Sequence, residues 1–177
     1  RIIMKTKSTC LITALLSLTI SSAVVANSQS NALKIAVVAD NHSSKNIVNG
    51  LYHSSINKLT RYSHSQKSYN NNMNLCVAYL KVGKAKKSTK ACSAAVISAE
   101  TALSNNSHSD YLKALSYSNR AVAKYQNKDI VGAIADLDKA VLIDANDITE
   151  SNLKVMKEHL KSDAEMASGN IPVTHNH

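Results

Sequence analysis

The sequence predicts an all-α fold, and three observations support this prediction. From Ile47 onward, apolar residues recur at steps of three and four residues, the spacing typical of amphipathic helices. The 177 residues include four glycines and one proline, too few breakers for a β-sandwich with many turns. Short polar turns separate the periodic stretches. Because the chain has no Phe or Trp, its interior must consist mainly of Ala, Leu, Ile and Val.

The first 26 residues are expected to be a signal peptide. Lys5 and Lys7 precede a largely apolar run, Cys10–Val25, and small residues end at Ala26. This pattern predicts export and cleavage after Ala26. An uncleaved anchor is the alternative, although the run is short for crossing a bilayer. Cleavage predicts a periplasmic or secreted protein that meets the membrane only transiently, through the signal peptide.

The charge of the chain is unevenly distributed. The formal net charge is +9, and removal of three basic residues with the signal peptide leaves +6. Residues 27–90 contain ten basic residues and one acid, whereas residues 91–177 contain eight and eleven. The first half is therefore cationic and the second half mildly anionic.

The elements after the signal peptide follow in order. Residues 27–45 are expected to be flexible or to dock, and the apolar run 33–39 could be a strand or the start of a helix docking on the first hairpin. Helices follow over 46–162, the last at 148–162, and residues 163–177 are expected to be disordered. The predicted breaks are a linker at 63–72, turns at 83–84, 127–129 and 145–147, and a loop at 105–110 with Ser109 or Asp110 as helix cap.

Two cysteines remain after export, Cys76 and Cys92. An even number in an oxidising compartment predicts a disulfide, which would stabilise this aromatic-poor chain by about 3 kcal/mol. Two small buried thiols packed between helices are the alternative.

The stretch Tyr117–Asp147, YSNRAVAKYQNKDIVGAIADLDKAVLIDAND, resembles a tetratricopeptide repeat. The small residues of that repeat correspond here to Ala121, Ala133 and Ala140, and a bulky residue corresponds to Leu137. Small side chains let the two helices of a hairpin approach, and larger ones fill the space beside them.

Weaker copies lie upstream, and the match has departures. One copy starts near Asn72 and a third lies around Gly50–Leu59, with registers offset by 33 and 45 residues. The longer offset predicts about eleven extra residues near 97–110. Arg120 and Lys124 occupy sites where the repeat has bulky apolar residues. An ordinary helical bundle is the alternative.

The resemblance implies a short α-α superhelix of about two and a half hairpins plus a capping helix. It places Cys76 opposite Cys92 across one helix pair. It also implies a peptide-binding groove, which either is open or is covered by the ends of the chain. The groove residues are Met73, Val77, Leu80, Lys81, Val122 and Tyr125. Met73 and Val77 replace the family's carboxylate-clamp residues, which argues against binding of chaperone tails.

Signals for catalysis are weak. The glycines form no phosphate-binding loop, and the scattered histidines form no His-x-x-x-His pair. We therefore expect no enzyme, no cofactor and no metal site. The expected function is a protein- or peptide-binding scaffold.

The alternative function is a structural envelope module that binds an anionic partner or surface through a basic patch, and export argues against nucleic acid. The basic patch comprises Lys81, Lys84, Lys86, Lys87 and Lys90. A solvated helix end is the simpler interpretation of these lysines.

Overall fold

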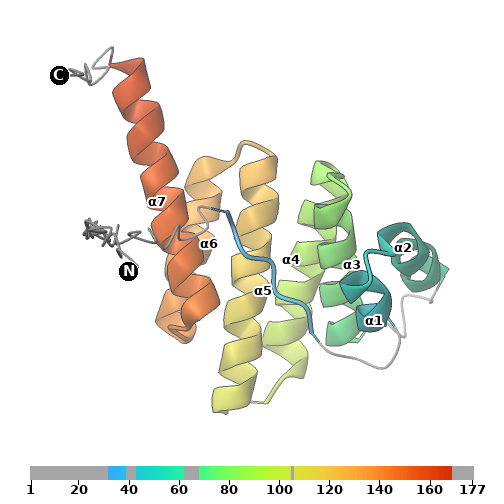
Figure 1. Cartoon of the computed structure of the whole chain (residues 1–177). Helices are drawn as coiled ribbons and strands as arrows, with labels where there is room; N and C mark the ends of the chain where they lie inside the picture. Colours follow the sequence, from blue (N-terminus) through green and yellow to red (C-terminus); the bar gives the residue numbers. More distant parts are fainter. Residues whose placement is uncertain (1–31, 39–42, 62–67, 105, 169–177) are drawn as a thin grey trace, which may run out of the picture. The chain divides into compact units, whose positions relative to one another are not determined.

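The computed structural model describes residues 32–38, 43–61, 68–104 and 106–168. Within these ranges it contains seven helices and no strand (Figure 1). The helices are α1 Ser43–Val48, α2 Tyr52–Arg61, α3 Tyr69–Lys81, α4 Ala85–Ala102, α5 Ser107–Gln126, α6 Ile130–Ile143 and α7 Asp147–Ala167. The all-α prediction is confirmed for this part of the chain. The predicted signal peptide, residues 1–26, lies outside it.

Each helix packs on the next along the chain, and α3 with α4 and α5 with α6 form the most extensive pairs. Tight turns allow this arrangement. In the α3–α4 turn Gly83 has φ of 67°, a conformation that costs glycine little because it lacks a Cβ. None of the described helices is long and apolar enough to cross a membrane.

Several predicted boundaries are wrong, among them the start of α1 at Ser43, and side-chain caps explain two others. α3 begins at Tyr69, inside the predicted linker, because Ser68 accepts a hydrogen bond from the Asn71 amide. α5 begins at Ser107 because Asn106 caps it, accepting from the Ser109 amide at 3.0 Å. α4 runs on to Ala102, so residues 97–102, where the sequence predicted part of an insertion, are helical.

A further boundary is the end of the last helix that the structure describes. α7 continues past residue 162 to Ala167, and the side chains of 161–166 are exposed. The predicted tail, 163–177, is thus helical over its first residues, while residues 169–177 lie outside the described part.

The two cysteines form a disulfide, as predicted. Cys76 on α3 and Cys92 on α4 have Cα atoms 4.6 Å apart, and both side chains are fully buried. They belong to a buried cluster that also contains Leu80 and Val122, so the disulfide joins α3 and α4 within the hydrophobic core.

The two basic departures from the repeat pattern are explained by a buried carboxylate. Asp136 on α6 accepts two hydrogen bonds of 2.7 Å from Arg120, and Lys124 Nζ lies 2.9 Å from its Oδ2. This hydrogen bonding raises the pKa of Arg120. Electrostatic pairing between α5 and α6 therefore replaces apolar packing at these two sites.

Candidate functional site

An extended stretch of the chain, residues 33–38, crosses the helices. Figure 1 shows this blue segment passing in front of α5, between the side of α7 and the side of α3. It is neither the strand nor the docking helix start that the sequence left as alternatives, and it reaches as far as α5 and α7. We call residues 33–38 the inner segment, and the helix faces that it covers the inner surface.

Two asparagine side chains hold the backbone of the inner segment. On α5, Asn119 Oδ1 accepts from the Ala36 amide at 2.9 Å, and its Nδ2 donates to the Ala36 carbonyl at 2.8 Å. On α7, Asn152 binds both groups of Lys34 in the same way, at 2.6 and 2.8 Å. Both asparagines are fully buried, so each amide replaces water for one residue of an extended chain.

The side chains of the inner segment are also engaged. Leu33 and Ile35 pack against the cluster that contains the disulfide, and Ile35 and Val37 pack against Val77 and its neighbours. Ala36 is 5% exposed and belongs to a cluster with Tyr69, Met73 and Leu115, among others. Only Lys34 and Ala32 are exposed in the described stretch 32–38.

Tyr69 is one wall of the Ala36 site. Its hydroxyl donates to the Leu112 carbonyl at 2.9 Å and accepts from the Ser116 hydroxyl at 3.1 Å. Burial raises the pKa of Tyr69 to about 12. Neutral Tyr69 therefore ties α3 to α5 next to the inner segment.

Five of the six predicted groove residues belong to, or pack against, the apolar clusters that the inner segment contacts, and Lys81 does not. Met73, Val77, Leu80 and Val122 are buried. Tyr125 is half-buried, and its hydroxyl lies 3.0 Å from His159 Nδ1 on α7. Lys81 is exposed at the end of α3.

The basic patch lies at the α3–α4 turn, and all five of its lysines are exposed. None of them forms an ion pair within the part of the chain that the structure describes. Lys87 Nζ stands 5.8 Å from the centre of the Tyr79 ring, within cation–π range.

A hollow of about 610 Å³ adjoins the basic patch between α3 and α4. Its apolar lining comes from Leu75, Ala91, Ala94 and Ile97, and Ile97 is 62% exposed. Two lysines of the basic patch, Lys87 and Lys90, also line this hollow. The hollow shares Leu75, Tyr79 and Ala91 with the cluster that contains the disulfide. It combines an apolar floor with positive charge.

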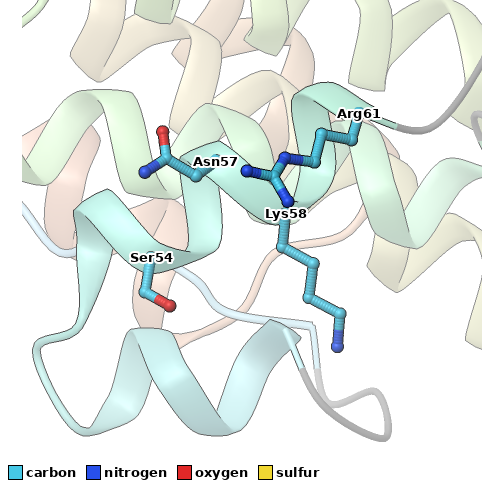
Figure 2. Close-up of a pocket in the computed structure, with 4 residues that line it drawn as sticks. All are labelled: Ser54, Asn57, Lys58 and Arg61. Atoms are coloured by element: carbon cyan, nitrogen blue, oxygen red, sulfur yellow. The ribbon is translucent and has the colours of Figure 1, made fainter.

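A second hollow, of about 410 Å³, lies on α2 (Figure 2). Its lining residues are Ser54, Asn57, Lys58 and Arg61, all from this one helix. Figure 2 shows Lys58 pointing away from Asn57, so the polar groups do not converge. Among the described residues, no group of three His, Cys, Asp or Glu side chains is placed to hold a metal ion.

Asn119 and Asn152, which hold the inner segment, are not among the site residues predicted from the sequence. A signal was present, because Asn74, Asn119 and Asn152 are spaced by 45 and 33 residues, offsets like those between the repeat copies. Asn74 is fully buried on α3. Asparagine favours turns, so its spacing alone does not predict a binding role inside helices.

Comparisons with known proteins give no guidance. No family model matches the chain, and neither a curated protein nor a solved structure matches it.

Proposed function

We propose that this chain is an exported, non-enzymatic scaffold of tetratricopeptide-like helical hairpins that binds an extended peptide on its inner surface. Sequential packing of short-turned helical pairs supports the repeat interpretation, and α7 takes the place of a capping helix. The buried disulfide favours an oxidising compartment, either periplasmic or extracellular.

One observation carries the proposal: two buried asparagines bind both backbone groups of alternate residues in an extended chain. Amide and carbonyl groups are common to almost every peptide, so this mode of binding does not depend on one side chain. The inner segment occupies the inner surface in cis. A partner peptide would take its place.

The test uses the full chain with Ala36→Arg, which puts a charged side chain into a nearly closed site and displaces the inner segment. An array of unrelated peptides is probed with this variant and with Ala36→Arg/Asn119→Ala. We expect a subset of peptides to bind the first protein and binding to fall at least about tenfold with the second. Binding unaffected by Asn119→Ala, with the helical circular dichroism signal intact, would contradict the proposal.

A second candidate function rests on the basic patch. Five exposed lysines beside an apolar hollow are suited to an acidic protein partner or an anionic surface. Residues 41–99 contain nine basic residues and no acid, so the sequence supplies no carboxylate there to neutralise them.

The dependence of binding on salt concentration distinguishes the two candidate functions. Binding through the basic patch should collapse as ionic strength rises, since exposed charges are screened, whereas binding to the buried asparagines should change little. Lys87→Glu/Lys90→Glu should abolish patch binding to vesicles rich in anionic lipid. Lys157→Glu/Lys161→Glu on α7 is the matched control, and equal loss in both variants would exclude a specific patch.

A further inference from the structure

We infer that the inner surface selects a particular class of peptide. The peptide is extended, runs in the same direction as the inner segment, and carries one exposed residue and one small residue, each flanked by aliphatic residues. This inference rests on the proposed function and specifies its ligand. The inner segment itself is an example of this class, with the sequence Leu33-Lys34-Ile35-Ala36-Val37.

The spacing of the two asparagines fixes the register. They hold residues 34 and 36, which lie two apart and so project their backbone groups in the same direction along an extended chain. Both residues must offer an amide hydrogen, so proline is excluded at each position. Any other residue satisfies this backbone requirement.

The site at residue 36 selects for size. Ala36 is 5% exposed among Tyr69, Met73 and Leu115, which come from α3 and α5. A leucine there would require these helices to move apart, and overpacking of a closed site is destabilising. Glycine, alanine or serine are the residues that fit.

The site at residue 34 is open. Lys34 is exposed, and its Nζ donates to the Asp147 carbonyl at 3.2 Å. Leu33, Ile35 and Val37 are half-buried against apolar clusters, so aliphatic side chains are selected at these three positions. Burial of each contributes through the apolar area removed from water.

The direction of the ligand is fixed as well. Residue 34 lies at α7, residue 36 at α5, and Val38 packs against the cluster that includes Tyr69 and Met73 of α3. The amino end of a bound peptide thus lies at α7 and its carboxyl end toward α3. A tethered occupant has an effective concentration on the order of millimolar, so the inner segment masks weak external ligands.

The experiment cuts the chain between the inner segment and α1, so that the inner segment is no longer covalently attached to the helices. A protease site replaces residues 39–42 in the full chain, and the folded protein is cleaved there. Fluorescent peptides with the sequence of residues 31–40 are then titrated, and anisotropy reports their exchange into the inner surface. Variants of this peptide carry Ala36→Leu, Lys34→Ala or an N-methyl group on residue 36.

We expect the parent and Lys34→Ala peptides to bind within about threefold of each other. Ala36→Leu, the N-methyl peptide and a reversed sequence should bind at least about tenfold more weakly. Equal binding of the Ala36→Leu peptide would overturn the inferred selection while leaving the proposed function standing. Failure of every peptide, the parent included, would instead reject the proposed function.

A second measurement covers the case in which cleavage unfolds the protein. In the uncut chain, Ala36→Ser should preserve slow hydrogen exchange across residues 33–38, and Ala36→Leu should accelerate it at least about tenfold. Equally slow exchange in both variants would overturn the inference.

Discussion

Asn119 and Ala36 form a complete exchange of hydrogen bonds: one side-chain amide of α5 satisfies both backbone groups of a residue 83 positions earlier in the chain. Buried amide and carbonyl groups need partners, and a single asparagine supplies both. The pair explains how an extended segment can lie over helices without belonging to a sheet.

Replacing this asparagine should loosen the inner segment. Asn119→Ala leaves the amide and carbonyl of Ala36 buried without these two partners, so we expect the free energy of unfolding to fall by about 2–4 kcal/mol. Hydrogen exchange across residues 33–38 should accelerate before the helices exchange. Asn57→Ala, at an exposed position of α2, is the control and should change stability by about 0.5 kcal/mol or less.

Reduction of the disulfide should lower thermal stability. The bond between Cys76 and Cys92 spans 16 residues, and closure of such a loop stabilises a protein by about 3 kcal/mol. For a chain of this size, the midpoint of unfolding should fall by about 6–12 °C on reduction. Scanning calorimetry with and without reductant measures this change, and a thiol assay confirms that both sulfurs are free. An unchanged midpoint in fully reduced protein would be the contrary result.

Removal of the buried carboxylate on α6 should be costly. Asp136→Ala leaves Arg120 and Lys124 partly buried without their counter-charge, and we expect a loss of about 3–5 kcal/mol in denaturant unfolding. Asp138→Ala is a close control, because Asp138 is more than half exposed and its ion pair with Lys157 measures 3.8 Å. That change should cost less than about 1 kcal/mol. Similar losses in the two variants would contradict the role given to Asp136.

Alkaline pH should weaken the contact between α3 and α5. The folded protein raises the pKa of Tyr69 from 10.0 to about 12, so the stability linked to its neutral form is present below pH 10. It should be lost as pH rises from 10 towards 12, with a total of about 2–3 kcal/mol. Urea unfolding across this range measures the effect. Tyr69→Phe should show a shallower decline, and an identical decline would contradict the assignment.

The sequence predicted the parts of this fold that depend on local pattern. Periodic apolar residues and alanines that allow close packing located the hairpins, and the pairing of Cys76 with Cys92 is confirmed. Turn signals at Gly83 and Asn127 also marked real helix ends. These features follow from residues close together in the chain, which is why they could be read without coordinates.

Features that depend on distant residues were not predictable in the same way. Asn72, Asn119 and Asn152 lie inside helices although asparagine favours turns, because each amide finds a partner elsewhere in the chain. Arg120 departs from the repeat pattern for a similar reason, since its partner is on the next helix. The course of the inner segment likewise depends on contacts with α5 and α7 that local sequence does not contain.

The bond between Lys34 and Asn152 spans 118 residues and so joins an early part of the chain to a late one. Synthesis delivers residues in order, so the stretch Leu33–Val38 is complete long before α7 has been made. The hydrogen bonds between this stretch and Asn152 can therefore form only after α7 has been made. Final placement of the inner segment is thus a late step of folding, although its residues are among the first to be synthesised.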